Sequence, residues 1–174
     1  MREHRYSVEL PHSPARLWAL MQDYDRWTEY APMVVGVQVV HRGDEQGNGL
    51  LRRVIYRMPL GRRGSALELV TGVEPARAYT YTMLSRNPGN DQTGSLRLVR
   101  LGPNLTRLHF EERYHLEGVP WRWLEGPIYR FINRKNEESI RSLSQWLSNH
   151  PEYRPDLVEG EEGPSKRGSA PSDA

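Results

Sequence analysis

The first thirty residues change from a strand period to a helix period. Apolar and polar residues alternate over residues 5–10, which predicts a half-buried strand. Ser13 followed by Pro14 is typical of a helix start, because serine caps the helix and proline suits its first position. An apolar stripe at helical spacing continues to Tyr24, and a second short helix is expected over residues 27–30.

Six more strand patterns follow, separated by turns rich in glycine, proline and asparagine. They cover residues 34–41, 50–57, 65–73, 78–85, 93–101 and 106–116. Short strands at this spacing predict an antiparallel meander.

Helical spacing returns after residues 118–120, with Pro127 near the predicted start and residues 149–151 at the end. The apolar residues recur at steps of three and four: Ile128, Phe131, Ile132, Ile140, Leu143, Trp146 and Leu147. This longest helix is the only element large enough to cover a seven-stranded sheet. The fold class is therefore α+β, with a curved antiparallel sheet wrapped around a long C-terminal helix. A twisted sheet that curls around one helix leaves space between them.

Length and composition narrow the function classes. Residues 1–150 suit one domain, and residues 151–174 are rich in Glu, Gly, Pro and Ser, which predicts a disordered tail. The net charge of +2, from 24 basic and 22 acidic residues, argues against a nucleic-acid partner. There is no run of about 20 apolar residues and no signal peptide, so we expect a cytoplasmic protein without a membrane span.

Metal and cofactor sites are not expected. The chain has no cysteine, and its six histidines do not have the spacing of converging metal ligands. We interpret the histidines as solvated surface residues, with His109 and His115 on the outer face of the last strand. No phosphate-binding loop or nucleophile elbow is present. The sequence does not distinguish a monomer from a homodimer.

The sheet face that turns toward the long helix should carry the apolar residues of each strand. Alternation selects Val54, Tyr56, Leu67, Leu69, Tyr79, Tyr81, Met83, Leu96, Leu98, Leu108, Phe110, Glu112 and Tyr114. A shift of one residue would reverse a strand's face. Most of these side chains are expected to be ordinary core, but nine tyrosines against two phenylalanines favour a lined cavity, since buried hydroxyls need partners.

Glu112 is the one charged residue in that set. It is in phase with Leu108 and Phe110, so it should point inward, where a carboxylate needs a partner or an elevated pKa. We favour an ion pair with a rim arginine, Arg53, Arg57 or Arg97, over a ligand-orienting or general-base role.

The chain resembles the START-like superfamily, and within it the polyketide cyclase/dehydrase and lipid-transport group. The resemblance covers about residues 4–149. It rests on four segments and the last helix: Ser13-Pro14-Ala15-Arg16-Leu17-Trp18, Asp23-Tyr24-Asp25-Arg26-Trp27, Val73-Glu74-Pro75-Ala76-Arg77, Thr93-Gly94-Ser95-Leu96, and the helix with Asn136 and Ile140. It implies a helix-grip fold, with two short helices after the first strand. It also implies a hydrophobic small-molecule ligand.

Aromatase/cyclases of that group use an arginine on a central strand, a tyrosine and a helix asparagine. The asparagine matches Asn136, whereas the arginine position falls on Gly72 and the tyrosine position near Val34, with Tyr30 as the nearest alternative. The resemblance therefore implies a ligand-binding shell more than cyclase chemistry. Tyr30 and the helix residues Ile132, Asn136 and Ile140 complete the expected lining.

Three functions remain open at this point. The preferred one is binding of a hydrophobic small molecule, such as a lipid, isoprenoid quinone or polyketide, in an internal cavity, with transport as an open option and with no cofactor. The second is a polyketide cyclase or dehydratase, with Glu112, Asn136 and Tyr81 as candidate catalytic groups. The third is an interaction module of the antitoxin- or ribosome-associated type, with a filled core.

Overall fold

The structure is a computed structural model that describes residues 2–57, 61–84, 92–114 and 119–153. For Tyr114, residues 119–125 and Ile128 it describes the backbone alone. The tail predicted over residues 151–174 falls almost entirely outside the described residues, as does His115.

Seven antiparallel strands form one sheet in the order β1-β7-β6-β5-β4-β3-β2. The strands are β1 (Arg2–Leu10), β2 (Val34–His41), β3 (Leu51–Arg57), β4 (Arg63–Glu74), β5 (Ala78–Met83), β6 (Thr93–Gly102) and β7 (Leu105–Tyr114). Each of β2 to β6 pairs with the next strand in the chain, and β1 closes the order by pairing with β7. The predicted meander is confirmed.

The helices are α1 (Pro14–Gln22), the 3-10 turn η1 (Tyr24–Arg26), α2 (Trp27–Tyr30) and α3 (Val119–Asn149). Ser13 caps α1, since its Oγ accepts a hydrogen bond from the Arg16 amide at 3.4 Å. The largest difference from the predicted helix boundaries is that α3 begins at Val119, so that Pro127 lies inside it. Strand ends differ by one to three residues, as in β1, which begins at Arg2 rather than at residue 5.

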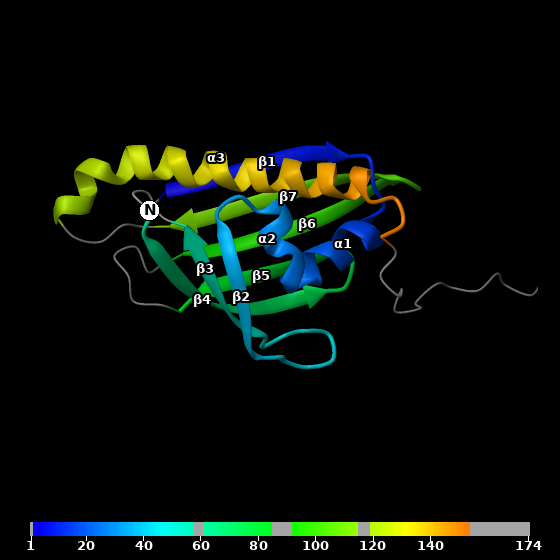
Figure 1. Cartoon of the computed structure of the whole chain (residues 1–174), viewed down its shortest axis with the longest axis horizontal. Coiled ribbons are helices and arrows are strands. Elements are labelled where there is room, and N and C mark those ends of the chain that lie inside the picture. Colours follow the sequence, from blue (N-terminus) through cyan, green and yellow to red (C-terminus); the bar gives the residue numbers. More distant parts are fainter. Residues whose placement is uncertain (1, 58–60, 85–91, 115–118, 154–174) are drawn as a thin grey trace, which may run out of the picture.

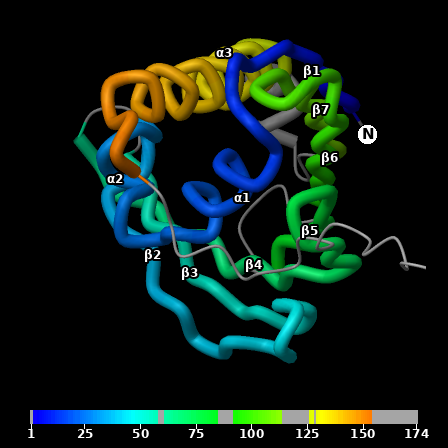
Figure 2. The backbone as a smooth tube through the Cα atoms, turned by 90° about the vertical axis from the view of Figure 1, so that its right-hand side faces the viewer, coloured from blue at the N-terminus to red at the C-terminus, as the bar shows by residue number. Residues whose placement is uncertain are grey.

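The sheet curves around α3, which runs along its concave side (Figure 1). Viewed at right angles, the strands and α3 surround α1 (Figure 2). This arrangement is the helix-grip fold, as the sequence predicted. Within the described residues, no helix is both long enough and apolar enough to span a membrane.

The apolar core is concentrated where α1 meets the sheet and the C-terminal half of α3. Leu17 and Leu20 of α1, Leu108 of β7 and Leu147 of α3 are completely buried. Trp18 packs edge-on against Tyr79 of β5 with ring centroids 5.9 Å apart. Full burial of such leucines contributes about 1.5–3 kcal/mol each, so this end of the fold is its stable part.

The segment that begins α1 also holds the C-terminal end of α3. The Arg16 guanidinium donates to the carbonyl oxygens of Leu147 and His150, at 2.9 and 2.5 Å. His12 Nε2 lies 2.9 Å from the Ser144 carbonyl oxygen. The last four carbonyls of a helix have no partner within the helix, so Arg16 satisfies that of Leu147, while His12 contacts the helix one turn earlier.

The expectation that all histidines are solvated is wrong for two of them. His4 and His12 are buried, with 9% and 5% of their surface exposed, whereas His109 lies exposed on the outer face as predicted. His4 stacks on Tyr6 and lies edge-on to Phe110. An imidazole can fill an aromatic position, which the residue type alone did not reveal.

Replacing His4 by phenylalanine is expected to stabilise the protein by about 1 kcal/mol at neutral pH. His4 Nε2 has no hydrogen-bond partner among the described residues, and such buried polar atoms are costly. Burial also lowers the pKa of His4, although Glu137 partly opposes this. As the pH falls, His4 is therefore protonated in the unfolded chain before it is protonated in the folded protein. This lowers the free energy of unfolding as the pH falls below about 6.5.

Urea unfolding between about pH 7 and pH 5 measures both effects. The wild type should lose stability on acidification, and H4F should lose less of it. Some pH dependence should remain, because burial lowers the pKa of His12 as well. His109→Phe, at an exposed position, is the control. An H4F protein as acid-sensitive as the wild type would contradict the prediction.

Candidate functional site

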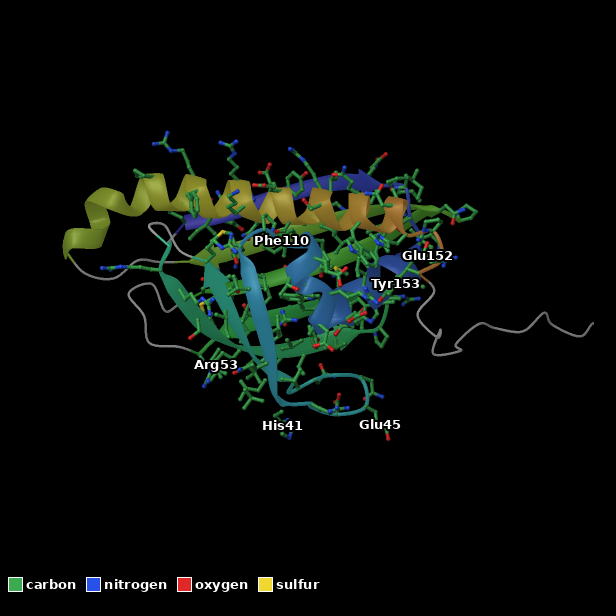
Figure 3. All side chains as sticks on the ribbon, in the orientation of Figure 1. His41, Glu45, Arg53, Phe110, Glu152 and Tyr153 are labelled. Atoms are coloured by element: carbon green, nitrogen blue, oxygen red, sulfur yellow. The ribbon has the colours of Figure 1, made fainter. Side chains whose placement is uncertain are left out.

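Strand pairing establishes which side chains face α3. The described inner-face residues that the sequence predicted are Val54, Tyr56, Tyr79, Tyr81, Met83, Leu96, Leu98, Leu108, Phe110 and Glu112. Figure 3 shows Phe110 beneath α3 and Arg53 projecting from the sheet on the other side. Tyr114 continues the β7 register opposite Arg2, but its side chain lies outside the described part. Tyr30 is buried in α2, and Ile140 is buried in α3.

Leu67 and Leu69 are on the opposite face, which corrects the prediction for β4. They pair with Arg53 and Leu51, whereas the inner face of β4 carries Ala66, Glu68 and Val70. Apolar content alone selects the two leucines as the inward pair. The inner face instead has a glutamate, because Arg52 of β3 lies directly opposite it.

Glu112 is the centre of a buried polar cluster, with 2% of its surface exposed. Its Oε1 accepts hydrogen bonds from the Tyr81 hydroxyl at 2.5 Å and from the Gln92 amide at 2.6 Å. Its Oε2 accepts one from the Asn136 amide at 2.8 Å. We call these four residues the Glu112 cluster. It joins β5, β7 and α3 across the concave side of the sheet.

The absence of a side chain at Gly94 makes this cluster possible. Gly94 of β6 pairs with Tyr81 on one side and with Glu112 on the other. A Cβ atom at Gly94 would overlap Cζ, Cε1 and the hydroxyl oxygen of Tyr81. The tyrosine ring therefore lies across β6, over the glycine, to reach a carboxylate two strands away.

The expected ion pair of Glu112 with a rim arginine is wrong. Arg53, Arg57 and Arg97 are all exposed, and Arg53 and Arg97 pair with outer-face residues. Within the described residues, the partners of Glu112 are instead three neutral donors. Burial raises the pKa of Glu112, and the hydrogen bonds from its donors only partly oppose that rise. The charge of Glu68 favours the protonated form further.

A second polar cluster contains the buried arginine. Arg52 Nε donates to Glu68 Oε2 at 2.9 Å, and both side chains are almost fully buried. The Tyr56 hydroxyl donates to the other carboxylate oxygen, Oε1, at 2.8 Å. The sequence pattern did not reveal this ion pair, although Arg52 is in phase with Val54 on the same strand.

Aromatic rings cover the guanidinium of Arg52. Its Cζ atom lies 4.5 Å from the ring centroid of Trp27 and 5.3 Å from that of Tyr24. Tyr79 lies beneath it at 5.8 Å. These cation–π contacts hold η1 and α2 against the sheet, and they cover the guanidinium with aromatic rings.

The position that the resemblance assigned to a cyclase arginine has no inward side chain. Gly72 lies in a bulge of β4 with φ of 57° and is exposed. A buried arginine does lie on the inner face, but it is Arg52, on the neighbouring strand. The other matched position, Asn136, does face the sheet and binds Glu112.

The inner face differs between its two ends. Near α1 its side chains are buried, whereas Tyr56, Met83 and Phe110 keep part of their surface accessible although they face α3. On α3, Ile132 and Asn136 are also only half-buried, while Ile140 is buried. Side chains between two layers that keep accessible surface indicate incomplete filling there. The Glu112 cluster lies at this end.

A shallow groove is separate from this cluster. It has a volume of about 320 Å³, lies between α2 and the C-terminal half of α3, and includes no residue of the Glu112 cluster. Across the described residues, no three His, Asp or Glu side chains are grouped so that they could hold a metal ion.

The family of proteins described as polyketide cyclase/dehydrase and lipid transport matches residues 1–148. The chain belongs to this family. The expectation from the sequence is confirmed at this level, since the match spans both the sheet and α3. No curated protein matches the chain.

Solved structures of the same fold have low sequence identity to this family member. The Zhui aromatase/cyclase from Streptomyces sp. R1128 is 14% identical with a TM-score of 0.75, covering 86% of this chain and 95% of its own. A protein from Thermus thermophilus is 17% identical with a TM-score of 0.72, covering 85% and 98%. A START superfamily protein from Mycobacterium smegmatis is 16% identical with a TM-score of 0.63, covering 86% and 97%. At these identities the likeness shows the fold.

Proposed function

We propose that this protein binds, and transports, a hydrophobic small molecule such as a lipid, an isoprenoid quinone or a polyketide. The molecule would lie between the sheet and α3, at the end where Tyr56, Met83 and Phe110 remain accessible. Those half-buried inward side chains are the observation that carries the proposal. When a ligand covers apolar surface that is otherwise in contact with water inside a fold, the removal of that surface from water favours binding.

The Glu112 cluster would bind the polar group of that molecule. Hydrophobic binding sites use a small number of polar groups at fixed positions to orient a ligand. The Glu112 cluster supplies such polar groups at the accessible end of the inner face. Membership of a family described by polyketide and lipid chemistry supports the same class of ligand.

Replacing Met83 by tryptophan is expected to weaken binding of the neutral dye Nile red by about tenfold, or ~1.4 kcal/mol. The larger ring would fill the space beside Glu68, its partner on β4. Leu84→Trp is the matched control, because the next residue along is exposed, with 48% of its surface accessible. Fluorescence titration gives both affinities, and native mass spectrometry of the purified protein would identify a co-purified ligand.

Equal affinities for Nile red in the wild type, M83W and L84W would contradict the proposed position. A protein that binds neither the dye nor any co-purified molecule would favour an interaction module instead.

A second candidate is a cyclase or dehydratase, and the short Tyr81–Glu112 hydrogen bond favours it. The hydroxyl and the carboxylate oxygen are 2.5 Å apart, the length of a strong, charge-assisted hydrogen bond, so Tyr81 and Glu112 would act on a substrate as one unit. A carboxyl group with a raised pKa can act as an acid or a base near neutral pH. Tyr81→Phe should then abolish turnover of a polyketide substrate while Nile red still binds.

A further inference from the structure

The described interior contains one buried arginine or lysine, and its charge is already compensated. Arg52 is 2% exposed and forms its ion pair with Glu68 while Trp27 covers its guanidinium. A ligand carboxylate would have to displace Glu68 to use that charge. Breaking such a buried pair leaves an uncompensated charge behind, so the exchange is unfavourable.

Among the described residues, the groups that face Glu112 are neutral or negative, and Arg2, two residues before His4 on β1, has its Cζ atom 5.5 Å from the ring centroid of Tyr129 on α3. His4 lies opposite it on β1, and burial lowers the pKa of this imidazole. From α3 come Asn136 and, beside His4, Glu137 at 3.7 Å. Across the sheet lie the hydroxyls of Tyr81 on β5 and Tyr56 on β3, the amide of Gln92, and the Glu68 carboxylate of β4.

A protonated Glu112 changes what this cluster offers a ligand. Burial raises the pKa of the carboxyl group and the charge of Glu68 adds to the effect. Once protonated, Glu112 can donate to the Tyr81 oxygen across the 2.5 Å hydrogen bond, which frees the tyrosine O–H to donate elsewhere. The cluster then presents a hydrogen-bond donor inside an apolar site, and the described side chains that bind Glu112 are all neutral.

We propose that the Glu112 cluster selects neutral apolar molecules that carry a hydrogen-bond acceptor, such as a ketone or quinone carbonyl, and rejects the carboxylates of free fatty acids. This inference rests on the proposed function, because it specifies the ligand class of the same site. A carbonyl accepts the donated hydrogen bond without adding charge. A carboxylate would bring a further negative charge into an interior whose one described buried cation, Arg52, is already paired with Glu68.

The test compares two ten-carbon ligands, 2-decanone and decanoate, as competitors of Nile red. At about pH 8 decanoate is ionised, and 2-decanone should bind at least about tenfold more tightly. The affinity of the wild-type protein for 2-decanone should fall as the pH rises and Glu112 loses its proton. Glu112→Gln keeps an amide donor at all pH values, so E112Q should bind 2-decanone with little pH dependence.

The control variant is Glu111→Gln, at the next position on β7. Glu111 contacts Arg113 on the outer face at 2.8 Å, so its removal should leave both affinities and the pH profile unchanged. A pH profile of E112Q as steep as that of the wild type would overturn the role of Glu112.

Wild-type protein alone tests the selectivity, independently of any variant. If decanoate binds as tightly as 2-decanone while M83W weakens both, the inference is overturned and the proposed binding function stands. If neither ligand nor Nile red binds, the proposed function fails and the inference fails with it.

Discussion

Replacing Arg52 by methionine is expected to lower the free energy of unfolding by about 3–5 kcal/mol, the usual cost of removing one partner from a buried ion pair. Glu68 would lose its counter-ion in the interior and, among the described residues, would retain the hydrogen bond from the Tyr56 hydroxyl. The cation–π contacts with Trp27 and Tyr24 would be lost as well, which loosens η1 and α2.

Arg53→Met is the matched control for this experiment. Arg53 is the next residue on β3, but it is exposed and projects from the other face of the sheet (Figure 3). Its replacement should change stability by no more than about 0.5 kcal/mol. The double variant R52M/E68M should recover much of the loss, since an apolar pair of similar volume needs no counter-charge. R52M as stable as R53M in urea unfolding would refute the prediction.

Replacing Gly94 by alanine is the second change with a large expected effect. The new methyl group would overlap the ring of Tyr81, which must then move away from Glu112. Overpacking of a filled interior costs about 1–3 kcal/mol, and a buried carboxyl that loses a donor adds to this. We expect a loss of stability of about 2–4 kcal/mol and weaker binding of 2-decanone.

Gly102 on the same strand provides the control. A Cβ atom there would meet the Leu105 Cβ at 3.7 Å, an ordinary contact, so Gly102→Ala should be nearly neutral. The overlap is tested by adding Tyr81→Leu to G94A. If the ring is the cause, the stability cost of G94A should largely disappear in the Y81L background, and a cost that persists there would point to another cause.

The proposed binding function rests on the accessible end of the inner face and on the Glu112 cluster. The α1 end supplies stability through fully buried leucines, so the other end can remain incompletely filled. The Arg52–Glu68 pair lies between these ends and neutralises its own charge. Within the described residues, the hydrogen-bond donors to Glu112 are all neutral, which leaves this inward carboxyl without a counter-ion.

The sequence by itself determined the order of elements and the inward direction of β7. The alternation from Leu108 to Glu112 identifies the inner face correctly, because Leu108 and Phe110 lie on one side of that strand and the other side is entirely polar. Strand β4 has leucines on one face and valine, alanine and glutamate on the other. Its periodicity therefore does not identify the inner face, and the leucines were assigned to the wrong side.

Only the tertiary structure decided which buried polar side chains contact one another. Arg52 and Glu68 are 16 residues apart, and Tyr81 and Glu112 are 31 apart, so strand pairing alone brings them together. Local patterns carry no information on such pairings, which depend on the register of strands distant in the chain. The sequence predicted that Glu112 would point inward, and the fold gave it Tyr81, Gln92 and Asn136 in place of an arginine.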